Sequence, residues 1–177
     1  IGKLHAQGHP TEEVTLHVGA GTFLPVKAKN AAEHDMHTEH FEIARSTLEH
    51  MAGRIGSITA VGTTSMRTLE SLGALGYRVL RDGTPEALDG RKLLEALSGW
   101  MREHGQEKLK ASTRIMIAPG YRFRIADSLI TNFHQPQSTL LLLVSAFIGD
   151  DWKKIYDYAL GHDFRFLSYG DSSLLIR

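Results

Sequence analysis

The stretch Ile55-Gly-Ser-Ile-Thr-Ala-Val-Gly-Thr-Thr-Ser-Met-Arg-Thr-Leu-Glu-Ser-Leu72 decides the fold. Residues 55–61 are typical of a buried strand, and residues 66–72 have the composition and spacing of a helix. The four residues between them are a glycine and three hydroxyl side chains. A strand that turns through a glycine into a helix is the start of a βαβ unit, so the stretch favours an α/β fold.

The same order of elements extends outward from this stretch in both directions. We expect further strands over 14–18, 76–80, 115–118 and 128–131, with one or two more within 164–176, and a loop over 105–112. We expect helices over 44–52, 85–104 and 151–160, and another that begins at Ser138. This alternation predicts a three-layer α/β/α fold with a mostly parallel sheet, as a single domain over residues 1–177.

Composition excludes several classes of protein. The 177 residues contain 20 Lys plus Arg, 20 Asp plus Glu and no cysteine, which rules out disulfides and Cys-ligated zinc or iron–sulfur sites. Zero net charge argues against a protein that holds nucleic acid by phosphate contacts alone. The longest apolar run, residues 140–148, is about half of a membrane span. We expect a cytoplasmic protein without a membrane partner and, because no Met or signal peptide starts the chain, a fragment.

Polar side chains follow three of the predicted strands, after Val18, Val61 and Thr131. In an open α/β sheet such strand ends lie along one rim, where ligands bind. The first turns of the helices that follow offer unpaired N–H groups to anions or polar ligand atoms. We therefore expect the functional site at this rim.

Two motifs near the N-terminus leave alternatives open. The segment Gly19-Ala-Gly21-Thr22 permits close backbone approach to a ligand, but it lacks the third glycine of a dinucleotide fingerprint, and a plain turn explains it equally. His34, His37 and Glu39 have the composition of a metal site without the His-Glu-x-x-His spacing. A polar or substrate-contacting loop is the alternative there, and a metal-dependent hydrolase stays open.

Two later motifs also have both structural and functional interpretations. Arg67 and Glu70 are spaced as a surface ion pair on a helix, or as site residues one turn beyond the hydroxyl groups. Ser138 is a plausible helix N-cap, whereas Asn132 and His134 have no structural reason to precede a helix, which favours function. The chain has no Gly-x-Ser-x-Gly elbow, which argues against a triad hydrolase.

Taken together, six blocks resemble one family, the S-adenosylmethionine:tRNA ribosyltransferase-isomerases of queuosine biosynthesis. The blocks are Val14-Thr-Leu-His-Val-Gly-Ala-Gly-Thr-Phe23, His37-Thr-Glu39, Ala60-Val-Gly-Thr-Thr-Ser-Met-Arg-Thr-Leu-Glu-Ser71, Pro119-Gly-Tyr-Arg-Phe123, Thr131-Asn-Phe-His-Gln-Pro-Gln-Ser-Thr-Leu140 and Phe164-Arg-Phe-Leu-Ser-Tyr-Gly-Asp171. The resemblance runs from Val14 to the C-terminus, apart from a divergent stretch over about 73–113. Gln135 stands where the family usually has an apolar residue.

The resemblance implies an enzyme about twice as long as this chain. The family has a β-barrel domain inserted in its N-terminal half and an Ala-Pro-Thr-Ala-Gly-Leu-His-Phe block just before the position of Ile1. We therefore expect this chain to be the C-terminal part of the family's α/β domain. A non-catalytic α/β remnant, or a nucleotide- or RNA-binding module, is the alternative interpretation.

The reaction implied by the family transfers and isomerises the ribosyl part of S-adenosylmethionine onto a 7-aminomethyl-7-deazaguanine base in a tRNA anticodon. Adenine and methionine leave, and the product base is epoxyqueuosine. The sulfonium acidifies the neighbouring C5′ hydrogens, so the protein must supply a base for that carbon, an acid for adenine and exclusion of water. The implied partners are S-adenosylmethionine as co-substrate and the anticodon loop of tRNA, without a metal. We expect a monomer.

Roles within this reaction are assigned as hypotheses. Catalytic proton exchange is expected from four residues, with the two imidazoles ranked first because their ordinary pKa suits neutral pH: His134, His17, Glu39 and Asp171. Substrate contacts are expected from Gly19, Gly21, Thr22, Thr63, Thr64, Asn132, Ser138 and Thr139. Cations for phosphate or the methionine carboxylate are expected from Arg67, Arg122 and Arg124. Either Tyr121 or Tyr169 is expected to stack on a splayed base.

Overall fold

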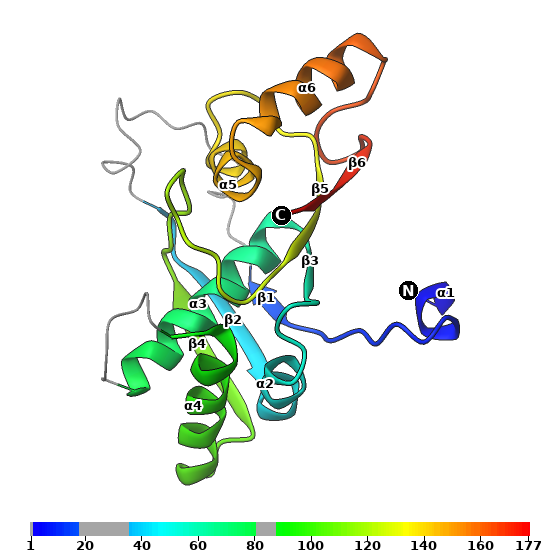
Figure 1. Cartoon of the computed structure of the whole chain (residues 1–177). Coiled ribbons are helices and arrows are strands. Elements are labelled where there is room, and N and C mark those ends of the chain that lie inside the picture. The colour runs from blue at the N-terminus through cyan, green and yellow to red at the C-terminus, as the bar shows by residue number, and fades with distance from the viewer. Residues whose placement is uncertain (1, 18–35, 81–87) are drawn as a thin grey trace.

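Two small sheets and two groups of helices make up the computed structural model, which describes residues 2–17, 36–80 and 88–177 (Figure 1). The first sheet contains β1 (Thr15–His17), β2 (Glu39–Ala44) and β4 (Lys108–Thr113), in the order β1-β2-β4. Both of its strand pairs are antiparallel. A short exposed helix, α1 (Gly2–Ala6), precedes it and lies away from the rest of the chain in Figure 1.

Three helices form the layer beside the first sheet. The α2 helix (Arg45–Ala52) contacts β2, α3 (Thr63–Leu80) contacts β4, and α4 (Gly90–Glu103) packs against α2 and α3. Alternate side chains of β2, Phe41 and Ile43, are buried toward these helices, while His40 is exposed on the opposite face. The α4 helix begins after Asp89, whose carboxylate accepts the N–H of Lys92 at 2.8 Å. Burial of the α4 leucines completes the core, as their spacing predicts.

The second sheet contains β3 (Thr59–Val61), β5 (Ser128–Asn132) and β6 (Ser172–Ile176), in the order β3-β5-β6. The β3–β5 pair is parallel and the β5–β6 pair is antiparallel. The α3 helix follows β3, and α5 (Thr139–Ile148) follows β5. The last helix, α6 (Asp151–Gly161), packs on α5, and the two lie together at one end of the molecule (Figure 1).

The α/β class is confirmed, but the mostly parallel sheet is a correction. Among the described strands, β3 and β5 form the one parallel pair, and the other three pairings are antiparallel. The reason is that successive strands alternate between two sheets. The chain from β3 to β5 passes through β4, which pairs in the first sheet, and β6 returns from α6 in the direction opposite to β5.

Three local predictions are also wrong. Residues 76–80 end α3 and do not form a strand, because Gly76 serves as a close helix contact: a Cβ there would collide with the Leu93 carbonyl of α4. The predicted loop 105–112 contains most of β4, whose outward lysines pair with Glu42 at 3.1 and 3.4 Å. Residues 115–118 belong to none of the described strands. Within the described ranges, no helix is long and apolar enough to cross a membrane.

Candidate functional site

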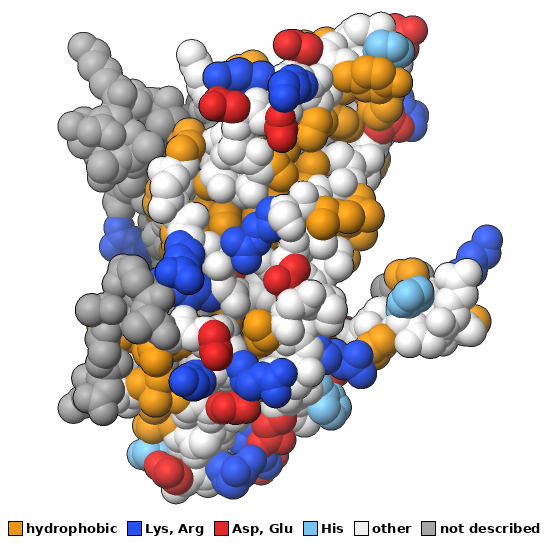
Figure 2. All heavy atoms as spheres, in the orientation of Figure 1, with side chains coloured by type: hydrophobic (Ala, Val, Ile, Leu, Met, Phe, Trp, Pro, Cys, Tyr) orange, Lys and Arg blue, Asp and Glu red, His pale blue; other side chains and the backbone are white. Residues whose placement is uncertain are grey.

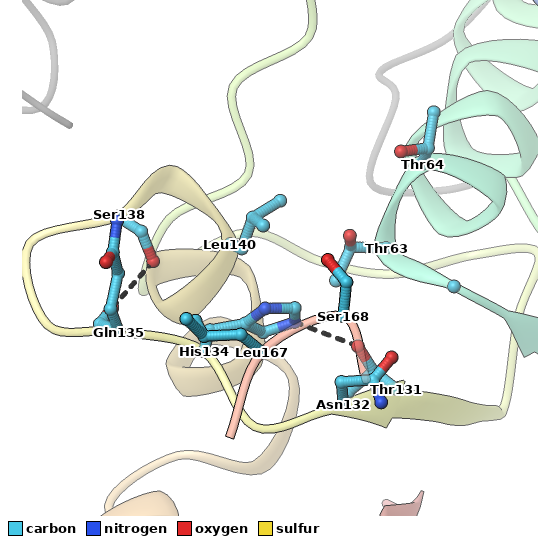
Figure 3. Close-up of a pocket in the computed structure, with 11 residues that line it drawn as sticks. Thr63, Thr64, Thr131, Asn132, His134, Gln135, Ser138, Leu140, Leu167 and Ser168 are labelled. Carbon is cyan, nitrogen blue, oxygen red and sulfur yellow. Dashed lines mark hydrogen bonds between the residues drawn. The ribbon is translucent and has the colours of Figure 1, made fainter. Parts of the chain in front are cut away.

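A cavity of about 270 Å³ lies where the parallel strands β3 and β5 end (Figure 3). Its wall includes the first turn of α3, the segment from β5 to the start of α5, and part of the segment that precedes β6. The lining residues are Gly62, Thr63, Thr64, Thr131, Asn132, His134, Gln135, Ser138, Leu140, Leu167 and Ser168. Two of the three strand ends that the sequence predicted at one rim therefore meet here, and the third, after Val18, lies outside the described residues.

The start of α3 forms one side of the cavity. Gly62 connects β3 to α3 with a φ of +93°, a conformation that favours glycine, and its N–H donates to the Ile130 carbonyl at 2.8 Å. This bond fixes the end of β3 to the neighbouring strand. Thr63 and Thr64 follow in the first turn of the helix, where N–H groups have no intrahelical acceptor. Backbone donors and two hydroxyl groups thus border the cavity together.

His134 forms the opposite side of the cavity (Figure 3). Its Nε2 lies 2.9 Å from the Thr131 hydroxyl oxygen, and its backbone N–H donates to the Tyr156 hydroxyl at 2.9 Å. Burial lowers the pKa of the His134 imidazole from its ordinary 6.5 to about 4, because the protein solvates the charged form less well than water does. The ring is therefore neutral at pH 7 and is held at one nitrogen by Thr131.

We expect an NMR titration of the His134 ring to have its midpoint near pH 4, with the His134→Gln variant identifying the resonance. The lowered pKa of His134 should also make the free energy of unfolding depend on pH. Between about pH 6.5 and 4 the unfolded chain binds a proton that the folded chain excludes, so the free energy of unfolding falls as the pH is lowered. A midpoint close to 6.5 would contradict the buried environment described for this ring.

Ser138 has the capping role that the sequence predicted. Its hydroxyl accepts the Leu141 N–H at 3.1 Å and donates to the Gln135 carbonyl at 2.8 Å, which closes the turn before α5. Ser138 also lines the cavity, so capping and lining are combined in one side chain. Thr139, the first residue of α5, is not among the lining residues.

The segment before β6 is held against β5 by Asn132. The Asn132 side-chain amide donates to the carbonyls of Gly170 and Asp171, both at 3.3 Å. Asp171 in turn accepts the Arg165 N–H at 2.7 Å, and this bond lowers the pKa of its carboxyl group below the ordinary value. Asp171 does not line the cavity, so in the structure it closes a turn and Asn132 fastens that turn to the sheet.

Glu70 and Tyr121 form a buried network away from the cavity wall. The Glu70 carboxylate accepts the N–H groups of Arg124, Ile125 and Ala126 at 3.0 to 3.2 Å, and the Tyr121 hydroxyl at 3.1 Å. Burial raises the pKa of both Glu70 and Tyr121, while the backbone donors oppose the shift at Glu70. Glu70 thereby fixes the segment that leads into β5.

Arg67 belongs to a second buried network. Its Nη1 lies 2.9 Å from Glu39 Oε2, with both side chains almost fully buried, and its Nε donates to the Ile115 carbonyl. Burial lowers the pKa of the Arg67 guanidinium, and the carboxylate of Glu39 opposes this shift. Neither residue lines the cavity. Arg122 is exposed on the segment before β5, also outside the cavity wall.

His17 lies on the first sheet, apart from the cavity at β3 and β5. It is the register partner of His40 on β2, and the two line a separate hollow with Ser112. Gly19, Gly21, Thr22 and His34 lie outside the described residues. Within the described ranges no group of three or more His, Cys, Asp or Glu side chains is arranged to hold a metal ion.

Three of the six sequence blocks supply all of the described residues that line the cavity. They are residues 60–71, 131–140 and 164–171. They include six lining residues that were not named as candidate site residues: Gly62, Thr131, Gln135, Leu140, Leu167 and Ser168. Their position inside the blocks was the only signal that marked them. The structure thus brings together blocks that are separated in the sequence by residues 72–130 and 141–163.

Comparison with known proteins shows the family to which the chain belongs. The sequence model of the family described as "Queuosine biosynthesis protein" matches residues 1–175. The chain belongs to the queuosine biosynthesis protein family. Similar curated proteins include the S-adenosylmethionine:tRNA ribosyltransferase-isomerases from Cereibacter sphaeroides and Burkholderia cenocepacia. Both are 44% identical to this chain, over 98% and 100% of it, respectively.

A solved structure agrees with this family membership. The crystal structure of an S-adenosylmethionine tRNA ribosyltransferase from Thermotoga maritima matches 99% of this chain with 31% identity and a TM-score of 0.63. The chain spans 43% and 44% of the two curated relatives and 48% of the solved one, so it corresponds to less than half of a family member.

Proposed function

We propose that this chain carries the S-adenosylmethionine site of a tRNA ribosyltransferase-isomerase. In that reaction the ribosyl part of S-adenosylmethionine is transferred to a 7-aminomethyl-7-deazaguanine base of tRNA and isomerised to give epoxyqueuosine. The observation that carries the proposal is that, in the part of the chain that the structure describes, the residues lining the cavity all come from three of the blocks that resemble the family. Such an enzyme works in the cytoplasm, where its tRNA substrate is found.

The cavity has donors for the polar parts of such a ligand. Thr63, Thr64 and the first N–H groups of α3 suit a carboxylate or ribose hydroxyls, because a helix N-terminus favours negative charge and hydrogen-bond acceptors. A volume of about 270 Å³ lies just below the roughly 300–1,000 Å³ typical of ligand pockets. We therefore assign the enclosed space to the sulfonium and ribosyl centre, with the remainder of the ligand extending through the opening.

His134 is the proposed proton carrier. With Nε2–H donating to the Thr131 hydroxyl oxygen, Nδ1 holds a free electron pair that accepts a proton from C5′, next to the sulfonium. The C–H electron pair stays on the carbon, where the adjacent positive sulfur stabilises it. The pKa of about 4 makes the neutral His134 ring a weak base, so the first proton transfer relies on the acidity that the positive sulfur gives to C5′. The resulting imidazolium is a strong acid and gives its proton to adenine, which leaves with the electron pair of its bond to the ribose. These steps use side chains of the protein alone.

Calorimetric titration of the chain with S-adenosylmethionine tests the site. We expect one molecule to bind per chain, and Thr64→Val to weaken binding about ten-fold through loss of one hydrogen bond. Thr59→Val is the matched control, because Thr59 is exposed on β3 and does not line the cavity. Absence of binding heat for the wild-type chain, or equal loss in both variants, would count against the proposal.

A further inference from the structure

Tyr169 is exposed to an unusual degree for an aromatic side chain. It is 97% exposed, whereas aromatic rings normally bury most of their surface. It follows directly after Leu167 and Ser168, both of which line the cavity. The aromatic ring is therefore presented to solvent at the margin of the proposed S-adenosylmethionine site.

The turn that carries Tyr169 is closed by hydrogen bonds on both sides. The Arg165 N–H donates to the Asp171 carboxylate at 2.7 Å, and the Asp171 N–H donates back to the Arg165 carbonyl at 2.8 Å. Gly170 fits because it has no Cβ, which would collide with the Arg165 carbonyl. Leu167 donates its N–H to the Phe133 carbonyl at 2.9 Å, so the turn is fixed to the segment after β5.

Side chains within this turn add to its rigidity. The Phe166 ring packs against Phe133 and Tyr156, with centroid distances of 5.2 and 5.9 Å. Leu167 has a φ of +71°, a left-handed conformation that residues other than glycine adopt only where the surroundings impose it. A turn held in this way fixes the backbone that carries the exposed ring, so binding has to order only the side chain of Tyr169.

Two other tyrosines, Tyr158 and Tyr121, are less suited to accept a planar ligand. Tyr158 is 58% exposed, but its ring stacks on His162 at a centroid distance of 3.9 Å, so one face is occupied. Tyr121 is partly buried, and its hydroxyl is bonded to Glu70. Figure 2 shows hydrophobic side chains gathered at the end of the molecule formed by α6 and the following segment.

We propose that Tyr169 is a stacking platform for an unpaired RNA base next to the cavity. The inference rests on the proposed function, which makes tRNA the partner. Unpaired bases are recognised by stacking on exposed aromatic rings, and a flat ring accepts any base because every base has a π-face. The guanidinium of Arg165, whose side chain is 75% exposed in the same turn, lies 3.5 Å from the Asp171 carboxylate. An ion pair this long and this exposed is weak, so the guanidinium can turn to the neighbouring phosphate.

Fluorescence anisotropy with a labelled anticodon stem-loop RNA tests the platform. We expect Tyr169→Ala to weaken binding by about 5- to 150-fold, which is the range measured for loss of one stacked base. Tyr169→Phe should bind like wild type, because the ring is kept. Tyr158→Ala, the matched control, should also bind like wild type. A fully paired, blunt-ended RNA duplex has no unpaired base to stack, so it should bind equally to Tyr169→Ala and wild type.

The outcomes separate this inference from the proposed function. Equal binding of the stem-loop to wild type and Tyr169→Ala, or absence of RNA binding, overturns the platform. A loss in Tyr169→Phe as large as in Tyr169→Ala also overturns it, because the hydroxyl and not the ring would then be responsible. The titration with S-adenosylmethionine is repeated on Tyr169→Ala and should be unchanged. If wild type binds RNA through Tyr169 but not S-adenosylmethionine, the proposed function fails and the platform stands.

Discussion

Replacement of Glu70 by alanine should lower the free energy of unfolding by about 3–5 kcal/mol, the largest loss that we expect from a single substitution. The Glu70 carboxylate accepts three backbone N–H groups and the Tyr121 hydroxyl, and all of these donors would lose their acceptor. Ile125 and Ala126 are fully buried, so water cannot reach their N–H groups without opening the core. Urea unfolding followed by circular dichroism measures the change.

Two variants give this prediction its controls. Glu70→Gln keeps the shape and one acceptor oxygen but turns an N–H donor toward backbone donors, so we expect an intermediate loss of stability. Glu95→Ala, on the exposed face of α4, should change the free energy of unfolding by less than about 0.5 kcal/mol. A Glu70→Ala variant as stable as Glu95→Ala would show that the network does not hold this segment.

Replacement of His134 by glutamine should lower the rate of adenine release from S-adenosylmethionine by about 100-fold or more, the usual effect of removing a general acid–base. The melting temperature should hardly change, because the bond from residue 134 to Tyr156 is made by the backbone N–H and is kept. The rate is measured with unmodified tRNA in this chain and, in parallel, in a full-length relative with the same exchange in the matching block. S-Adenosylmethionine affinity is measured in the same variants.

His162→Gln is the matched control for this substitution. His162 is exposed after α6, where its ring bonds to the Tyr158 carbonyl and stacks on the Tyr158 ring, away from the cavity-lining residues. Its turnover should equal that of wild type. Equal loss of turnover and of melting temperature in His134→Gln would indicate a structural histidine, and retained turnover would remove His134 from the mechanism.

The sequence predicted the cavity wall better than the sheets. Strand-to-helix turns at Gly62 and before Ser138 were recognised because glycine and a capping serine have local meanings that tertiary structure seldom changes. Strand β4 was missed because its outward lysines and its inward Ala111 give a weak alternation. Gly76 was interpreted as the start of a strand, whereas its lack of a Cβ serves a contact between two helices. Such contacts are not visible in a local pattern.

The roles of charged residues were the least predictable part of the site. Arg67 and Glu70 are three residues apart, which is typical of a surface ion pair, yet each is buried and bonded to a different distant segment. The pairing of Arg67 with Glu39 and of Glu70 with backbone donors depends on how strands from two sheets meet α3. A sequence shows that polar groups are present, but only the folded chain shows whether their bonding capacity is already used.

The reciprocal bonds between Arg165 and Asp171 affect how the sequence of this turn can evolve. They run through backbone atoms and the Asp171 carboxylate, and the side chain of Tyr169 takes no part in them. Replacement of the Tyr169 side chain therefore removes none of the hydrogen bonds that close the turn. Under the proposed function, selection can adjust RNA binding at this position without removing a bond that shapes the cavity wall, so the two properties can evolve separately.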